Sequence, residues 1–175
     1  MEMTNSLSLT RAAAQQSMKN EVRLNAAYID GDWVTIEASD SVGEHALYDP
    51  SSGEAIATTR LCNSAQVESA AHAAARAYPS WSQTSFNERA RYLQAIADTM
   101  ERQFDKLVGL SVLNNGKPIA EAKIDVSDAI ACYRYYANLI IEQATWSKVE
   151  TNESSIRLLK TYAPVGICAL IVPWN

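Results

Sequence analysis

The chain has 175 residues, of which 47% are hydrophobic and 20% are charged, and its formal net charge is −5. This length and composition predict one globular domain, since a domain typically holds ~100–200 residues. The acidic balance argues against a nucleic-acid-binding protein, which would carry a basic stripe. Three cysteines without a Cys-x-x-Cys pair and only two histidines predict neither a disulfide framework nor a metal site.

Residues 1–25 are rich in small and polar side chains and predict a flexible tail. A signal peptide would need an apolar core of about 7–15 residues, but the candidate core at residues 7–9 is interrupted by Ser8 and followed by Arg11. No window approaches ~18 consecutive apolar residues, so we predict no membrane span. These observations favour a cytoplasmic protein with no membrane partner.

Two hairpins are predicted after the tail. Asp30 and Gly31 lie between β-prone residues, and an Asp-Gly pair favours a tight hairpin turn because glycine tolerates a positive φ. Pro50 and Gly53 predict a second turn between two further strands, since proline presets φ and glycine permits the reversal.

A helical block follows these hairpins. Apolar residues recur at helical spacing over 67–78, after a cap at Asn63 or Ser64. We expect Pro79 to end this helix, because proline lacks the backbone N–H that a helix interior requires. A serine and a glutamate at the two ends of 85–88 form a capping-box pattern that predicts the start of a second helix.

Two more helices complete the block. One is expected to begin at Asp105 and to stop at Asn115 and Gly116, because glycine favours the left-handed conformation that ends helices. Pro118 is placed to open the next element. Apolar residues spaced along 130–141 mark this last, long helix.

The pattern changes after the helices. Residues 145–149 and 155–162 alternate well enough to predict a third hairpin. Residues 165–172 are then a continuous apolar run, which is typical of a strand buried on both faces of a parallel sheet. Such a strand needs neighbouring strands and covering helices that no later residue supplies. We therefore expect the sequence to be the front portion of something longer.

Five segments, in order along the chain, resemble the aldehyde dehydrogenase superfamily, and together the resemblance covers about residues 26–175. The first two are similar to the family's opening hairpin and to its Asn-Pro-Ala-Thr-Gly-Glu turn, with Asp49 in place of the Asn. The next two are similar to its Glu-Thr-Gly-Lys-Pro stretch and to a tetrapeptide on the helix before its oligomerisation hairpin. The fifth leads into the Pro-Trp-Asn motif. In order, they are residues 28–34, 48–54, 113–118, 134–137 and 158–175.

The resemblance implies an α/β fold, specifically an incomplete doubly wound, Rossmann-like cofactor domain. It divides the chain into four parts: a flexible tail, the N-terminal part of the cofactor-binding domain, an oligomerisation hairpin and the first strand of the dinucleotide-binding sheet, cut short. These parts are residues 1–25, 26–144, 145–162 and 163–175.

The same resemblance implies site residues at the end of the chain. Asn175 matches the asparagine whose side-chain amide N–H donates to the oxyanion that forms when a cysteine thiolate attacks the aldehyde. Such a donor can contribute ~3–4 kcal/mol to lowering the barrier. Val172, Pro173, Trp174 and Asn175 match positions whose backbone contacts NAD or NADP. No metal is implied.

The family's nucleophilic cysteine, general-base glutamate and glycine-rich turn would all lie beyond residue 175. Cys168 lies inside the apolar run, upstream of the motif, and is not that nucleophile. We therefore predict a fragment of an oxidoreductase that oxidises an aldehyde to a carboxylic acid with NAD or NADP and is inactive alone.

Two other hypotheses compete with the inactive fragment. The first is a non-catalytic interaction protein that docks through the 145–162 hairpin onto full-length sibling subunits, or forms a homo-oligomer. Strand addition at an open hairpin edge would supply the contact. The second is a free helical binding module with no role in the family.

Overall fold

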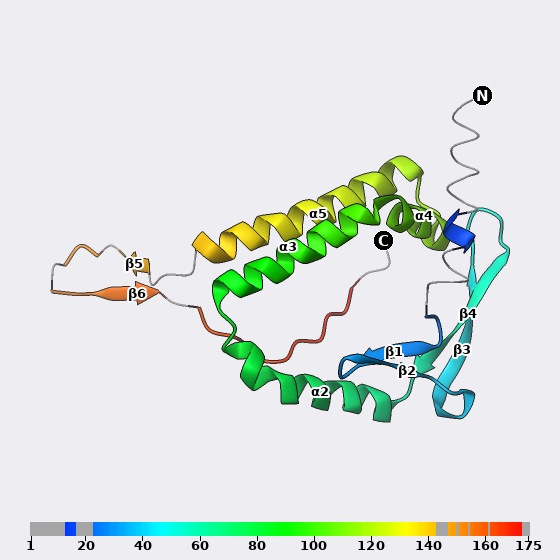
Figure 1. Cartoon of the computed structure of the whole chain (residues 1–175), viewed down its shortest axis with the longest axis horizontal. Helices are drawn as coiled ribbons and strands as arrows, with labels where there is room; N and C mark the ends of the chain where they lie inside the picture. Colours follow the sequence, from blue (N-terminus) through cyan, green and yellow to red (C-terminus); the bar gives the residue numbers. More distant parts are fainter. Residues whose placement is uncertain are drawn as a thin grey trace.

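The computed structural model describes residues 13–16, 23–142, 147–149, 151–153, 155–160 and 162–172. In these residues the strands form three separate two-stranded antiparallel sheets, and none of them joins a larger sheet. Figure 1 shows helices α3 (Phe86–Arg102) and α5 (Ile119–Glu142) side by side, α2 (Ser64–Ser82) on the opposite side of the molecule, and the last hairpin extending away from both. The chain is therefore a mixed α/β protein with a helical centre.

The first two hairpins form where the sequence predicted them. Strand β1 (Ala26–Ile29) pairs with β2 (Asp32–Thr35), and the turn residues Asp30 and Gly31 have φ values of 56° and 84°. Two consecutive positive φ values are the mark of the type I′ turn that matches strand twist. Strands β3 (Ser41–Tyr48) and β4 (Ala55–Cys62) form the second pair, after the short 3₁₀ helix η1 (Ala38–Asp40).

The buried side chain of Asp49 organises the second turn. Its carboxylate accepts hydrogen bonds from the backbone N–H and the hydroxyl of Ser51 at 2.8 and 2.6 Å. This Asx-type turn satisfies a buried carboxylate, which would otherwise be costly to desolvate. The turn also lies against the end of a helix, because a Cβ added to Gly116 would lie 3.0 Å from the Cβ of Pro50.

Helix α2 begins at the predicted cap but continues past the predicted end. Asn63 and Gln66 form a reciprocal capping box, with N–H to side-chain oxygen distances of 3.0 and 2.8 Å. The prediction that Pro79 ends the helix is wrong, because α2 runs to Ser82. Proline removes one N–H and crowds one carbonyl four residues earlier. So close to the end of α2 this loss disturbs a single turn, and the Ser82 hydroxyl donates to the Pro79 carbonyl at 2.9 Å.

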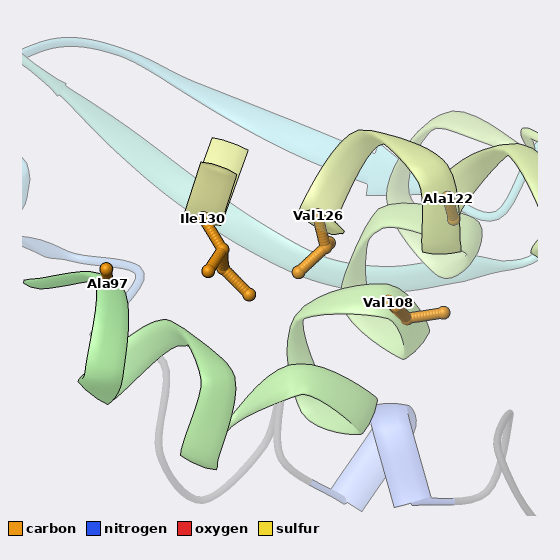
Figure 2. Packing of buried hydrophobic residues seen from close by; sticks show 5 residues of the cluster. All are labelled: Ala97, Val108, Ala122, Val126 and Ile130. Carbon is orange, nitrogen blue, oxygen red and sulfur yellow. The ribbon is translucent and has the colours of Figure 1, made fainter. Parts of the chain in front are cut away.

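Helices α3, α4 (Phe104–Asn115) and α5 enclose the main core. Its buried residues come from all three helices and are Ala97, Val108, Ala122, Val126 and Ile130. Figure 2 shows Val126 and Ile130 extending from α5 toward the helices beneath them. Ala97 and Ala122 are fully buried in this core, and side chains this small allow neighbouring helices to pack closely.

A second, smaller cluster ties the N-terminal residues to the fold. Residues 13–16 are helical, and Ala14 is buried against Leu113 of α4. Leu24 and Ile56 pack around the same cluster, and the Thr59 hydroxyl donates to the Leu24 carbonyl. At least this part of the tail that was predicted to be flexible therefore contacts the core.

The described residues of the C-terminal part contain the predicted hairpin and no further strand. Strand β5 (Ser147–Val149) pairs with β6 (Leu158–Lys160), as predicted. Residues 162–172 are assigned to no strand, and Val165, Leu170 and Ile171 are 90%, 86% and 95% exposed. The assignment of 163–175 as the first strand of a dinucleotide-binding sheet thus stays a prediction. Among the helices described, none is long and apolar enough to cross a bilayer.

Candidate functional site

Of the four predicted site residues, only Val172 lies within the described chain, at its end. Val172 is described and is 71% exposed. Pro173, Trp174 and Asn175 lie outside the described residues. The assignments of Asn175 as an oxyanion donor and of 172–175 as cofactor contacts therefore stay predictions.

The segment that leads to these residues runs past α2. In Figure 1 it leaves β6, passes α2 and continues between α2 and the α3–α5 pair in that view. The Tyr78 hydroxyl of α2 donates to the carbonyl of Pro164 at 3.4 Å. Gly166 then has a φ of 107°, a conformation that side-chain-bearing residues rarely adopt. Helix α2 and Gly166 thus shape the course of the described chain that follows β6.

The structure shows no activating base beside Cys168 in the described part of the chain. Cys168 is exposed, and its Sγ atom lies 4.0 Å from the carbonyl oxygen of Gly166. A thiol must lose its proton before its sulfur can attack as a thiolate, and a backbone carbonyl is not a base that could remove that proton. Cys62 and Cys132 are also free thiols. No group of three or more His, Cys, Asp or Glu residues suited to a metal ion occurs among the described residues.

The main polar cluster on the helical core joins α5 to α3. The Arg134 guanidinium contacts the Glu101 carboxylate at 2.6 Å and the Asp98 carboxylate at 3.4 Å, and Gln94 donates to Asp98 at 3.0 Å. Hydrogen bonds to Glu101 and then to Asp98 raise the pKa of Arg134 above its ordinary value. None of these residues was among the site residues predicted from the sequence. The three-residue spacing of Asp98 and Glu101 on one helix face was the only local signal of this cluster.

A groove of about 490 Å³ lies beside this ion pair. Its lining mixes apolar, neutral polar and charged side chains from α3, the start of α4 and α5: Glu101, Phe104, Ser127, Ile130, Ala131, Arg134, Tyr135 and Asn138. Its cation, Arg134, is already engaged by two carboxylates. A dinucleotide pyrophosphate is best held by free cations together with N–H donors, and the described lining of this groove offers no free cation to the phosphates of NAD or NADP.

The β5–β6 hairpin is the other feature with functional potential. Several of its apolar side chains are about half exposed, namely Val149, Ile156, Leu158, Leu159 and Tyr162. The Lys160 ammonium lies 4.8 Å from the centroid of the Tyr162 ring, an arrangement of the cation–π type. A two-stranded hairpin with apolar side chains and open edges is suited to binding another chain.

Comparisons with known proteins agree on one family. The model of the aldehyde dehydrogenase family matches residues 36–175. An aldehyde dehydrogenase of Emericella nidulans is 33% identical over 130 residues, which is 74% of this chain and 26% of that protein. Peroxisomal aminoaldehyde dehydrogenase 1 of Pisum sativum is 33% identical over 156 residues, covering 85% of this chain and 30% of that protein. The chain thus spans less than a third of the length of these relatives.

Solved structures resemble the fold as well. The crystal structure of betaine aldehyde dehydrogenase from Staphylococcus aureus in complex with NAD⁺ aligns with a TM-score of 0.70 and 26% identity, covering 85% of this chain and 29% of that one. Proline utilization A from Bdellovibrio bacteriovorus aligns with a TM-score of 0.71 and 29% identity, covering 83% of this chain and 14% of that one. The arrangement of hairpins and helices described above therefore recurs in much longer enzymes.

Proposed function

Because the chain belongs to the aldehyde dehydrogenase family, as its N-terminal portion, we propose that it is part of an oxidoreductase that converts an aldehyde to a carboxylic acid with NAD or NADP. The observation that carries the proposal is the continuous family match over residues 36–175. The fold supports it, since its α/β arrangement matches an incomplete cofactor domain of this family. Cytoplasmic localisation is also proposed, although the Pisum sativum relative is named as peroxisomal.

We assign Asn175 the role of oxyanion donor within the complete protein, on the resemblance of the Pro-Trp-Asn motif. Its amide N–H would hydrogen-bond the aldehyde oxygen as that oxygen becomes negative, which stabilises charge where it develops. The thiolate that attacks the carbonyl carbon, and the base that activates it, would come from residues outside this sequence. Val172, Pro173 and Trp174 would place backbone groups along the cofactor side of the same pocket.

Cofactor binding by this chain alone does not fit the residues present. Gly166 is not part of a Gly-x-Gly-x-x-Gly pattern, which occurs nowhere in the sequence, and such a turn holds the pyrophosphate in many dinucleotide sites. The Arg134 charge is paired with carboxylates. We derive no hydride-transfer step from this chain, and we propose that it is catalytically inactive by itself.

An activity assay tests this proposal. Purified chain, freed of host dehydrogenases, is mixed with betaine aldehyde or acetaldehyde and with NAD or NADP, and formation of the reduced cofactor is followed by absorbance. We expect no turnover, because loss of even one member of a catalytic set can lower the rate by ~10⁴–10⁶. Turnover that persists after purification and disappears in Asn175→Ala would contradict the inactive fragment. Reading the DNA beyond codon 175 for an in-frame or frameshifted cysteine motif tests membership of a longer enzyme.

A second candidate function rests on the β5–β6 hairpin. It extends away from the helical body in Figure 1 and carries half-exposed apolar residues. The chain would then be an interaction protein that adds this hairpin to a full-length subunit of the same family. The test is co-purification with a full-length paralogue from the same genome. Docking through the hairpin would be supported if Leu159→Lys abolishes the co-purification and Val67→Lys on α2 leaves it intact. Equal capture of both variants would argue against it.

A further inference from the structure

Helix α4 ends in an asparagine followed by a glycine, a pair with a chemical reactivity of its own. Asn115 is the last residue of α4, and Gly116 follows it with a φ of 75°. In such a pair the backbone nitrogen of the glycine can attack the side-chain carbonyl carbon of the asparagine, because glycine has no Cβ to obstruct the approach. This is the only Asn-Gly pair in the sequence.

Two hydrogen bonds hold both reacting groups in the folded chain. The Gly116 N–H donates to the carbonyl of Val112 at 3.0 Å, so the nitrogen that would attack is engaged in the last turn of the helix. The Asn115 side-chain oxygen accepts a hydrogen bond from the Lys117 N–H at 3.0 Å, which holds the side-chain amide in one orientation. Ring closure requires the nitrogen to lose its proton and the side chain to turn toward it. Both hydrogen bonds must therefore break first.

Packing against distant parts of the chain holds this helix end in place. Pro50 of the second turn lies against Gly116, since a Cβ added to the glycine would lie 3.0 Å from the Cβ of the proline. Leu113, in the last turn of α4, is 2% exposed and packs with Ala14 in the smaller core cluster. Opening of the α4 end therefore requires the loss of buried contacts as well as of hydrogen bonds, and a segment held in this way opens rarely.

We propose that Asn115 is a deamidation site that is protected while the α4 end is folded and reacts when this end opens. In the open form the Gly116 nitrogen forms a bond to Cγ of Asn115, and the Cγ–Nδ2 bond breaks. The side-chain nitrogen leaves as ammonia and takes with it the proton of the former backbone N–H. Water then opens the cyclic imide at either of its two carbonyls, which gives aspartate or isoaspartate.

Either product changes the end of α4 permanently. Both carry a carboxylate at the C-terminal end of a helix, where the macrodipole disfavours negative charge. Isoaspartate also adds a methylene to the backbone between residues 115 and 116, so the next N–H no longer lies in register with the Val112 carbonyl. A molecule that has opened once is therefore marked and opens more easily again. The inference goes beyond the proposed enzymatic role and uses none of the residues predicted for it.

Peptide mapping by mass spectrometry measures the reaction on the full chain during incubation in mildly alkaline buffer. The same chain in denaturing urea gives the rate of the open form. We expect the folded chain to react at least about tenfold more slowly, because a protected segment reacts only during the fraction of time in which it is open. Asn114 is exposed and is followed by a residue with a side chain, so it is the internal reference and should react more slowly than Asn115 in urea. Equal rates for Asn115 in the folded and unfolded chains would overturn the proposal.

Two variants test whether the α4 end itself controls the reaction. Leu113→Ala removes packing beneath this end and leaves the Asn-Gly pair intact, so it should accelerate deamidation of the folded chain by about tenfold or more. Ile130→Ala removes a buried side chain of the main core and is the matched control, which should accelerate the reaction less. Equal acceleration would show that global unfolding sets the rate, and an unchanged rate in Leu113→Ala would show that packing at the α4 end gives no protection. Either result contradicts the proposal. If Leu113→Ala does not fold, Leu113→Val is the milder variant and should act in the same direction.

Discussion

The helical core and residues 162–172 both carry apolar side chains, but these side chains are buried in the core and exposed in residues 162–172. In the core, Ala97, Val108 and Ala122 are 0%, 1% and 0% exposed. In residues 162–172, Val165 and Leu170 are 90% and 86% exposed. A helix satisfies its own backbone and needs only one apolar contact face, whereas a strand needs a hydrogen-bonding neighbour and cover on its faces. Apolar sequence alone therefore does not make a core. The partners must be present too.

Amide hydrogen exchange should reveal the largest contrast between the two regions. We expect amides of α3 and α5 to exchange at least about a thousandfold more slowly than those of residues 167–172, since core helices open only with much of the global unfolding free energy. The measurement should be made on the monomeric fraction at low protein concentration. Strong protection of 167–172 in that monomer would show that the segment has found a partner within its own chain.

A charged side chain introduced into the helical core should lower the free energy of unfolding far more than one introduced into residues 162–172. Val108→Asp places an unpaired carboxylate in the core and should lower the free energy of unfolding by ~3–5 kcal/mol, or prevent folding. Leu170→Asp in the exposed segment is the matched control and should change it by less than ~0.5 kcal/mol. Chemical denaturation of both variants measures the difference. Comparable losses would mean that residue 170 is buried in solution.

The sequence revealed features that depend on a few neighbouring residues. The turn at Asp30 and Gly31 and the cap at Asn63 were predictable because each works within four residues. The Pro79 prediction failed because the position of the proline within the helix, rather than its presence, sets the cost. The contact of Arg134 with Asp98 spans 36 residues and requires α3 and α5 to be docked already. The spacing of Asp98 and Glu101 along α3 does not indicate that Arg134 is their partner.

The candidate site residues were predicted from the sequence by a different route than the turns and the helix cap. Asn175 and its neighbours were identified only through motif resemblance, since a lone asparagine after an apolar run has no distinctive pattern of its own. The run at 165–172 predicted a buried strand from its composition. Composition does not say which segments would cover it, and the described structure leaves it uncovered.

Loss of the α2 cap should have an intermediate effect. Asn63→Ala removes the acceptor for the Gln66 N–H and should lower the free energy of unfolding by about 1 kcal/mol. Asn63→Asp keeps an oxygen in the same place and is the control. Thermal unfolding followed by circular dichroism would compare them. If the alanine and aspartate variants melt together, α2 is not coupled to the cooperative unit that contains α3 and α5.

Removing the α3–α5 ion pair should have the smallest effect. Arg134→Gln should lower the melting temperature slightly, and Arg134→Lys should lower it less, because Lys keeps the charge but not the forked geometry. Since the pKa of Arg134 is raised, its contribution is complete below the ordinary arginine pKa and is lost only as pH rises through the raised value. The difference between wild type and Arg134→Gln should shrink in high salt. A salt-independent difference would point to lost packing.

The main core is built from one continuous stretch of the chain, which affects the order in which the chain can fold during synthesis. All five buried residues of that cluster lie within the span of α3 to α5, so the core can close once that span has left the ribosome. Residues 167–172 emerge after the span that forms this core. Because translation adds ~5–20 residues per second, the core has time to close before the exposed apolar side chains of residues 167–172 leave the ribosome. Nascent chains carrying these side chains are therefore expected to recruit chaperones at this point rather than earlier.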